Sequence, residues 1–268
     1  MSVIIAHTAV VDSRAQLGDD VRIGHFCVIG PHVRIGAGTH VENHVTIMGH
    51  TTIGENNHIF PNAVIGAEPQ DLSYQGSPTQ VIIGDGNVIR EGCTINRATE
   101  KEDGITSIGD HCYLMAYAHI AHDCRLSDRI VMANNCMLGG HVHIDHDAIL
   151  SGGVAVHHYA SIGAYCFISG LSRVKQDVPP YMLAEGSPAR PRTVNVVGLK
   201  RNDFSSDEIR VITEAFKLYY RKSIGVAETR QRLLETGPIQ PSLVRLLDFL
   251  DHQTGGKNGR GRDRRKAA

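Results

Sequence analysis

The stretch VRIGHFCVIGPHVRIGAG, residues 21–38, has an aliphatic side chain at every sixth position, at Ile23, Ile29 and Ile35. The same step of six continues without exception over residues 5–65 and 108–174, and a shorter run covers residues 83–95. This period fits neither an amphipathic helix nor an alternating strand. It indicates a repeat architecture in which each unit of six residues is one short strand and one corner.

Three such units make one triangular coil. The aliphatic residue points inward, a small or β-branched residue two positions earlier shares the interior, and the Gly that often follows relieves the corner backbone. Successive coils stack at the sheet spacing of about 4.8 Å, and each buries the next. The pattern resembles that of hexapeptide-repeat proteins, which implies a left-handed parallel β-helix. The expected fold class is therefore mainly β, with this solenoid over residues 1–190.

The six cysteines all lie two residues before an inward aliphatic position: Cys27, Cys93, Cys112, Cys124, Cys136 and Cys166. That spacing predicts small core residues rather than disulfides or a CxxC motif. Reduced thiols predict a cytoplasmic protein. The chain has neither an opening apolar segment with basic flanks nor an apolar run of about 18 residues, so we expect no signal peptide and no stable membrane insertion.

Two polar segments, 67–80 and 96–106, interrupt the repeat. Insertions into a solenoid project as loops, often on its binding side. After residue 174 the repeat fades into an extended connector, and Ser205 and Glu208 then have the spacing of a capping box. An apolar stripe with helical period follows over 209–219, and shorter helices are expected near 226–235 and 242–252. The sequence thus predicts a small α-helical C-terminal domain over 191–254.

The last segment, 255–268, has six basic residues and one acidic residue and no apolar pattern. It is expected to be a disordered, solvated basic tail. The formal net charge of the whole chain is −1, so no nucleic-acid partner is expected.

The segment AHIAHDC, residues 118–124, places Asp123 directly after His122. Counting forward by one coil, or three units, stacks His122 against Gly140, and Gly139 against His157, on one edge of the prism. A Gly-Gly pair leaves a backbone N–H uncovered, which could stabilise an oxyanion. His122 could take a proton from an acceptor while Asp123 holds its tautomer. This constellation predicts acyl transfer directly from a thioester.

A zinc site is the competing interpretation of these histidines. Hexapeptide-repeat carbonic anhydrases bind zinc with two histidines five residues apart and a third well upstream. His141 and His146 have that spacing, but no histidine occupies the corresponding upstream position. A third interpretation, a non-enzymatic β-helix scaffold, would make the clustering of histidines accidental.

Seven segments together resemble one family, the cytoplasmic UDP-N-acetylglucosamine 3-O-acyltransferases: IGPHVRIG, PQDLSY, AHIAHDC, MANN, GGHV, QDVPPY and VNVVGLKR. The resemblance extends over about residues 5–250. It implies a homotrimer that moves an (R)-3-hydroxyacyl chain from acyl carrier protein to the 3-hydroxyl of UDP-N-acetylglucosamine, the first step of lipid A biosynthesis. It also implies no metal and no cofactor, because the carrier-protein thioester is the acyl donor.

The resemblance also implies roles for individual residues. The catalytic ones would be His122 as general base, Asp123 as its orienting group and Gly140 as oxyanion donor. Gly170 would set the acyl-chain length, and its small size would admit a long chain. The substrate-binding residues would be Gln70, Asp71, His119, His141, His157, Asn195 and Arg201.

Three positions depart from the family pattern. Ser73 stands where a Lys is usual, Asn96 where a His is frequent, and Asn202 where a second Arg is common. Two lost cations would weaken diphosphate binding by about 1–3 kcal/mol each unless other basic groups replace them. The departures leave open an acceptor with a 3-amino group. The related N-acyltransferase is not expected, because it has an N-terminal uridine-binding domain and the repeat begins here by Ile5.

Overall fold

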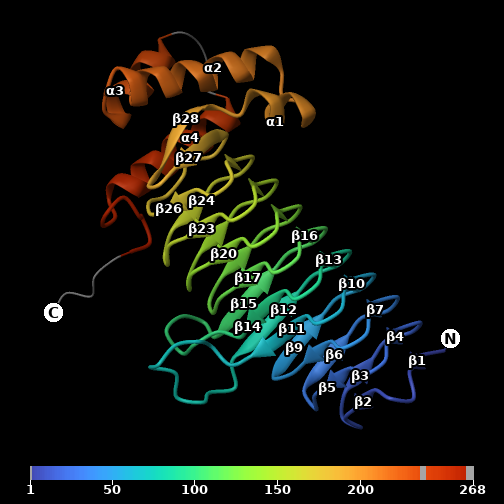
Figure 1. Cartoon of the computed structure of the whole chain (residues 1–268). Helices are drawn as coiled ribbons and strands as arrows, with labels where there is room; N and C mark the ends of the chain where they lie inside the picture. The colour runs from blue at the N-terminus through green and yellow to red at the C-terminus, as the bar shows by residue number, and fades with distance from the viewer. Residues whose placement is uncertain (1, 236–239, 264–268) are drawn as a thin grey trace.

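The computed structural model of the chain describes residues 2–235 and 240–263. Most of it is a prism with three faces, each a sheet of short parallel strands (Figure 1). Sheet A comprises β1 (Ile4–Ile5), β4 (Arg22–Ile23), β7 (His40–Val41), β10 (His58–Ile59), β13 (Val88–Ile89), β16 (Tyr113–Leu114), β19 (Val131–Met132), β22 (Ile149–Leu150), β25 (Phe167–Ile168), β27 (Met182–Gly186) and β28 (Ala189–Val194).

The other two faces complete each coil. Sheet B comprises β2 (Val10–Val11), β5 (Val28–Ile29), β8 (Thr46–Ile47), β11 (Val64–Ala67), β14 (Thr94–Asn96), β17 (His119–Ile120), β20 (Met137–Leu138), β23 (Ala155–Val156) and β26 (Arg173–Val174). Sheet C comprises β3 (Gln16–Leu17), β6 (Val33–Ile35), β9 (His50–Ile53), β12 (Gln80–Ile83), β15 (Ile105–Ile108), β18 (Arg125–Leu126), β21 (His143–Ile144) and β24 (Ser161–Ile162).

The register of these sheets follows the period read from the sequence. His119 pairs with Met137 and Ile120 with Leu138, one coil of three units further along the chain. From Ile23 to Val174 the inward aliphatic residues of the repeat, such as Ile120, are buried, so the interior is a column of apolar side chains. The predicted fold class, a left-handed parallel β-helix with a small helical C-terminal part, is confirmed.

The Gly after the inward aliphatic residue has a different reason from the one expected. A Cβ at Gly36 would lie 2.5 Å from the carbonyl carbon of Gly54, so these glycines allow two coils to approach closely. Apart from Gly66, with φ of +80°, the left-handed backbone falls on other corner residues, among them Asp123 and His141, with φ of +59° and +63°. Asp and His tolerate this region better than β-branched residues do.

The six cysteines are buried and free, as the spacing predicted. Cys124, for example, donates Sγ–H to the carbonyl of Gly139 at 3.2 Å. Burial raises the pKa of the Cys124 thiol to about 12. These thiols are therefore small core residues and weak nucleophiles.

The segment after the repeat is more ordered than the expected extended connector. Strands β27 and β28 form an antiparallel hairpin, and β27 also pairs in parallel with β25. The hairpin thus extends sheet A and closes the end of the solenoid. Since β28 runs to Val194, the helical part begins later than the expected boundary at 191.

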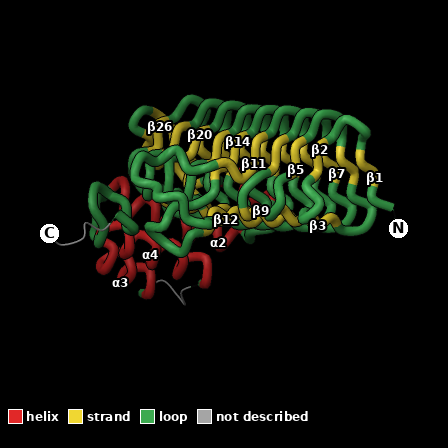
Figure 2. Tube along the Cα trace, turned by 90° about the horizontal axis from the view of Figure 1, so that it is seen from below, coloured by secondary structure: helices red, strands yellow, loops and turns green. Residues whose placement is uncertain are grey.

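The helices gather at the C-terminal end of the solenoid (Figure 2). They are α1 (Val196–Arg201), α2 (Ser206–Phe216), the π-helical turn η1 (Lys217–Arg221), α3 (Val226–Leu234) and α4 (Pro241–Thr254). Ser205 and Glu208 form the expected capping box at the start of α2. Within the described residues, no helix combines the length and apolar character needed to cross a membrane.

The tail departs from its prediction. Residues 255–263 pack against the β-helix instead of being disordered. Arg260 is only 7% exposed and donates to the carbonyl of Lys175 at 2.9 Å, and the N–H of Gly261 donates to the buried Asp177 carboxylate at 2.7 Å. Composition missed this order because the partners are backbone groups and acidic side chains, not an apolar stripe. The rest of the expected tail, 264–268, lies outside the described residues.

Candidate active site

The two predicted insertions open from one edge of the prism. We call the corners that lead from sheet B to sheet C the B–C edge; it includes residues 121–124, 139–142 and 157–160. The first loop, 68–79, joins β11 to β12, and the second, 97–104, joins β14 to β15. Both loops therefore leave the B–C edge next to the AHIAHDC segment, as the projecting loops of Figure 1 show.

His122 and Asp123 form a tightly held pair on this edge. The Nδ1 atom of His122 lies 2.7 Å from Oδ2 of Asp123, whose side chain is 1% exposed. Thr99 donates its N–H and its hydroxyl to the same carboxylate, the hydroxyl at 2.7 Å, and the hydroxyl of Thr106 accepts the N–H of Asp123 at 2.8 Å. Because an ionised carboxylate only accepts, it fixes the proton of neutral His122 on Nδ1 and leaves Nε2 free to accept a proton.

Gly140 faces this imidazole from the next coil. A Cβ there would lie 2.3 Å from Cε1 and 2.6 Å from Nε2 of His122, so only Gly leaves room for the ring. The neighbouring N–H groups are occupied: Gly139 donates to Val156 at 2.9 Å, and His141 donates to His122 at 3.0 Å. The N–H of Gly140 has no acceptor within the described part of the chain and is available as a donor.

His141 is buried beside the pair. Its ring stacks on Tyr159 at 4.3 Å between centroids and meets the His122 ring edge-on at 5.2 Å. Its Nδ1 lies 3.0 Å from Oε1 of Glu102, and its Nε2 lies 3.6 Å from Oδ2 of Asp123. The hydrogen bond from His141 is the main cause that lowers the pKa of Glu102, so this carboxyl is ionised near neutral pH.

Asp71 reaches the site from the first loop. Its Oδ2 lies 3.8 Å from Nε2 of His122 and forms an ion pair with Lys101 of the second loop. Ser73 donates its N–H and hydroxyl to the other carboxylate oxygen, at 2.9 and 2.8 Å. The hydrogen bond from Lys101 is the largest cause that holds the pKa of Asp71 well below its usual range. Lys101 therefore brings a cation to the region where Ser73 replaces the usual Lys.

Two further predicted residues lie near this cluster. His119, on β17, contacts Thr94 through Nδ1 at 2.7 Å, and burial lowers its pKa. His157 lies farther along the B–C edge, with Nδ1 3.0 Å from the carbonyl of His158. It borders a cavity of about 380 Å³ that Lys175, Arg190 and Arg260 also line. Gln70 is exposed in the first loop.

The remaining predicted residues lie elsewhere on the prism. Asn195 and Arg201 line a cavity of about 530 Å³ over sheet A. Asn195 caps α1 by accepting from the N–H of Gly198 at 3.1 Å, and it donates to the carbonyl of Tyr165 at 2.9 Å. Gly170 lies in the corner that leads from sheet A to sheet B. A single chain therefore does not bring Asn195, Arg201 or Gly170 to His122.

Comparison with known proteins identifies the family of this chain. A model of bacterial transferase hexapeptide repeats matches residues 14–49, and a model of domain 2 of UDP N-acetylglucosamine O-acyltransferase matches residues 177–261. The acyl-[acyl-carrier-protein]–UDP-N-acetylglucosamine O-acyltransferase of Halorhodospira halophila is 45% identical over 248 residues, 92% of this chain and 96% of the relative. The chain belongs to this family of O-acyltransferases.

Other relatives support the same membership in the O-acyltransferase family. The enzyme of Leptothrix cholodnii is 52% identical over 217 residues, 81% of this chain and 82% of its own. The crystal structure of the UDP-N-acetylglucosamine O-acyltransferase of Moraxella catarrhalis superposes with a TM-score of 0.89 at 39% identity, covering 92% and 96% of the two chains. The Arabidopsis UDP-N-acetylglucosamine acyltransferase gives 0.81 at 31% identity, covering 96% and 98%.

Membership in the O-acyltransferase family decides between the functional alternatives. The resemblance seen in the sequence is confirmed, and acyl transfer to oxygen is supported over the amine acceptor, the scaffold and the carbonic anhydrase. The histidine pair of the zinc interpretation also fails to converge. His141 lies on the B–C edge, whereas His146 lies in the corner from sheet C to sheet A, where its Nδ1 is 2.7 Å from Asp147.

Two departures from the family pattern have local structural roles. Asn96 donates to the carbonyl of Glu68 at 2.6 Å and ties the first loop to sheet B. Asn202 donates to the carbonyl of Gly198 at 2.9 Å and closes the end of α1. Neither contact touches the His122 cluster.

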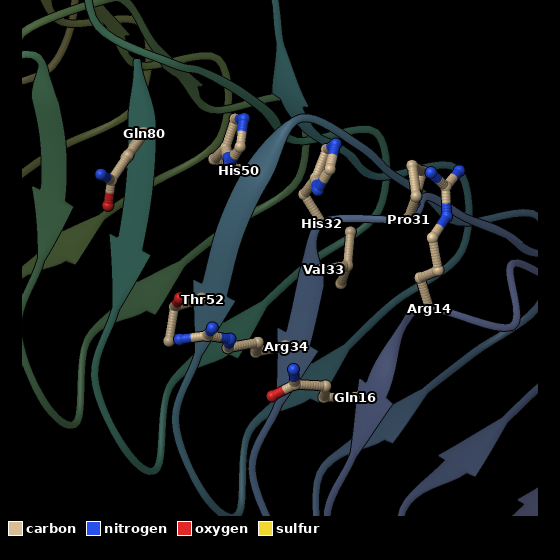
Figure 3. Close-up of a pocket in the computed structure, with 9 residues that line it drawn as sticks. All are labelled: Arg14, Gln16, Pro31, His32, Val33, Arg34, His50, Thr52 and Gln80. Atoms are coloured by element: carbon tan, nitrogen blue, oxygen red, sulfur yellow. The ribbon is translucent and has the colours of Figure 1, made fainter. Parts of the chain in front are cut away.

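The described residues also include two groups of side chains that could ligate a metal ion and one further polar cavity. Ligand atoms of His122, Asp123 and His141 lie within 4.8 Å of one another, as do those of a second group, His40, Glu42 and His58. A polar cavity of about 260 Å³ lies on the outer face of sheet C in the N-terminal half, with Arg14, Arg34, His32 and His50 among its lining residues (Figure 3). It contains none of the predicted site residues.

Proposed function

We propose that this chain transfers an (R)-3-hydroxyacyl group from acyl carrier protein to the 3-hydroxyl of UDP-N-acetylglucosamine, the first step of lipid A biosynthesis. One observation carries the proposal beyond family membership. Nε2 of His122 is available for a proton because Asp123 holds Nδ1. The ring occupies the space that a Cβ of Gly140 would need, and the N–H of Gly140 has no acceptor within residues 2–235 and 240–263.

In the proposed reaction His122 acts as general base. Its Nε2 takes the proton of the 3-hydroxyl as that oxygen attacks the thioester carbonyl. The carbonyl electrons move to the oxygen, and the N–H of Gly140 stabilises the oxyanion. The tetrahedral intermediate then collapses, the C–S bond breaks, and protonated His122 returns the proton to the leaving thiolate. Asp123 keeps the imidazole oriented and stabilises its charged form.

The surrounding residues would bind the acceptor. Gln70 and Asp71 would contact the sugar, and His119, His141 and His157 would line the cleft for the sugar nucleotide. Lys101, 44% exposed and already close to Asp71, would contribute positive charge near the diphosphate. This contribution would offset the loss of the usual Lys at Ser73.

A homotrimer would complete the site. Large apolar side chains are exposed on the outer faces of sheets A and B and on the edge between them, at Ile4, Val10, Phe26, Val28, Tyr117, Met137 and Leu171. Sheet C has one such residue among the described strands, Ile82. A three-fold ring, with sheet A of one chain against sheet B of the next, would cover these side chains. It would also bring Asn195 and Arg201 of one chain toward His122 of its neighbour.

Gly170 would set the acyl-chain length from the edge between sheets A and B. A Cβ there would have the carbonyl oxygen of Gly152 as its nearest contact, at 3.3 Å, so a larger side chain would extend outward from the edge. If the acyl chain lies along that edge, such a substitution would reduce the longest acyl chain that the protein accepts. The six buried free thiols and the nature of both substrates support a cytoplasmic location.

The deciding experiment is a product assay by mass spectrometry. Purified protein receives UDP-N-acetylglucosamine, or its 3-amino analogue, with a series of 3-hydroxyacyl carrier proteins of increasing chain length. We expect acylated UDP-N-acetylglucosamine, with the preferred chain length identified by the largest yield. Product from the amino sugar alone would show that the acceptor group is an amine. No product from either sugar nucleotide would reject the proposed acyltransferase activity.

The same assay tests the general base. His122→Ala should lower turnover by about two or more orders of magnitude, because proton transfer in the transition state is lost. His25→Ala, an exposed histidine near the N-terminal end, is the matched control and should retain full turnover. Turnover of His122→Ala close to that of the unchanged protein would remove His122 from the mechanism.

A further inference from the structure

The C-terminal segment reaches the active site through Arg262. Its Nη1 donates to the carbonyl of His141 at 2.6 Å, and its Nη2 contacts both carboxylate oxygens of Glu102 at 3.0 and 3.3 Å. The side chain is 21% exposed, and burial is the main cause that lowers its pKa. Two residues far apart in the sequence therefore form a partly exposed ion pair against His141.

This pair fixes His141 at two points. Glu102 accepts a hydrogen bond from the Nδ1–H of His141, which favours that tautomer. This contact orients the ring so that Nε2 faces the carboxylate of Asp123. Arg262 holds the carbonyl of His141, while the N–H of His141 is held by His122. The backbone that directly follows Gly140 is thus clamped from both sides.

The segment has its own anchors, so Arg262 is not a loose side chain. Asp177, 3% exposed, accepts from the N–H of Gly261, and its own N–H donates to the carbonyl of Gly259 at 2.8 Å. Gln253 of α4 donates to the carbonyl of Asp177 at 2.9 Å. The residues before Arg262 are therefore attached to the solenoid by buried contacts.

We infer that Arg262 and Glu102 are positioning residues for the acyl transfer: they hold His141, and through it the Gly140 N–H, in the geometry that stabilises the oxyanion. The inference rests on the proposed function, because it assigns these residues to the same site. It makes the C-terminal segment a part of the active site rather than a solvated end. Neither residue needs to touch the reacting atoms for this role.

The test compares kcat and KM of Arg262→Ala with those of the unchanged full-length protein. We expect kcat to fall about tenfold, the effect of losing a charged hydrogen bond, with KM for UDP-N-acetylglucosamine nearly unchanged. Glu102→Gln should give a similar loss, and the double variant should lose little more, because both act through His141. Added guanidinium ion should restore part of the kcat of Arg262→Ala, whereas sodium at equal ionic strength should not.

Arg125→Ala is the matched control. Arg125, on β18, forms an ion pair with Asp103, which lies next to Glu102 in the second loop. Arg125 makes no polar contact with His141 in the described part of the chain, so the kcat of Arg125→Ala should stay within about twofold of that of the unchanged protein. An equal loss in Arg125→Ala, with no rescue of Arg262→Ala by guanidinium, would mean that the contacts only order the loop. A kcat of Arg262→Ala within twofold of the unchanged protein would also overturn the inference.

A second readout does not depend on turnover. The imidazole ¹⁵N shifts of His141 should report a proton on Nδ1 in the unchanged protein and a mixture of tautomers in Glu102→Gln. The same shifts in both proteins would reject the positioning role. An unchanged protein that forms no product would instead reject the proposed function, and the ¹⁵N shifts would still decide whether Glu102 holds His141.

Discussion

Gly140 combines two requirements that no other residue type meets. Its missing Cβ makes room for the imidazole of His122, and its N–H is left without an acceptor within the described chain. Its φ is not in the left-handed region, so the requirement is space rather than backbone freedom. The site therefore depends on the close approach of two coils at this residue.

Gly140→Ala should leave the solenoid folded and lower kcat by about 10- to 100-fold, because the oxyanion donor and the base would no longer be aligned. The new Cβ would lie within 3 Å of three ring atoms of His122, whose side chain can move more easily than the backbone can. Steady-state kinetics on the purified variant measure the loss. Gly152→Ala is the control, since its Cβ would have its nearest contact at 3.6 Å. Full activity in Gly140→Ala would contradict the stacking of His122 on Gly140.

His143 gives the protein a sensitivity to mild acid. Burial, and next the charge of Arg262, lower its pKa to about 4, whereas the unfolded value is about 6.5. The unfolded chain therefore binds more protons between these pH values. The contribution of neutral His143 to the free energy of unfolding is therefore complete above about pH 6.5 and is lost as the pH falls toward about 4.

Thermal midpoints measured from pH 7 to pH 4 test this sensitivity. His143→Leu should show a smaller decrease across that window than the unchanged protein, by an amount equivalent to about 1–3 kcal/mol. His25→Leu, a substitution of an exposed histidine, should keep the original slope. Parallel curves for the unchanged protein and His143→Leu would refute the assignment.

Among single residues, the sequence predicted the site residues that lie in the hexapeptide repeat and missed those that lie outside it. Counting coils predicted the stacking of His122 on Gly140, Asp123 follows His122 in the chain, and the family resemblance implied His141. The structure brings these four residues together. Lys101 and Glu102 lie in a loop without periodicity, and their roles depend on its folded path. Arg262 was missed because a basic segment without apolar residues resembles a solvated end.

At the scale of elements, α2 shows how a helix of this small domain begins. Ser205 accepts from the N–H of Glu208 at 3.2 Å, and Glu208 accepts the N–H of Ser205 at 3.0 Å. Ile209, Ile212, Ala215 and Phe216 then bury one face of the helix. The capping box was visible in the sequence because both partners lie within one turn.

Ser205→Ala should destabilise the first turn of α2 by about 1 kcal/mol, because one N–H loses its side-chain acceptor. Hydrogen exchange of the α2 amides should then be about fivefold faster, with the β-helix amides unchanged. Ser206→Ala alters an exposed residue next to it and should leave the exchange rates as they were. Equal rates in both variants would mean that the capping box contributes no stability.

Other elements were harder to predict for a physical reason. The strands of the solenoid follow a strict period, and α3 and α4 occupy the two segments where helices were expected. The β27–β28 hairpin has neither period, and its partner, β25, belongs to the preceding repeat. Its pairing is a tertiary preference that a local pattern does not contain.

At the scale of the whole molecule, the outer faces of the prism differ in polarity. Val28 on sheet B is 46% exposed and belongs to the apolar set that a trimer would cover, whereas Ile82, 38% exposed, is the comparable residue on sheet C. Val28→Glu should therefore dissociate the proposed trimer, and Ile82→Glu should not. Sedimentation velocity distinguishes a trimer from a monomer. A trimeric Val28→Glu would place the interface elsewhere.

The same substitutions link assembly to activity. Because Asn195 and Arg201 lie over sheet A, away from His122 of their own chain, a monomer would lack the contacts that we propose these two residues make with the acceptor. The Val28→Glu variant should accordingly lose activity together with its assembly, and Ile82→Glu should keep both. Activity in a monomer would show that one chain suffices.

The stacking of coils has one more consequence, for evolution of substrate length. Between His122 and Gly170 no loop interrupts the repeat, and there the addition or removal of one layer is a change of one whole coil, three units of the repeat. Changes of this kind between His122 and Gly170 would alter their separation only in increments of about 4.8 Å. Point substitutions would therefore change the accepted acyl-chain length by less than the height of one coil. Gain or loss of whole coils would change it in steps of that height.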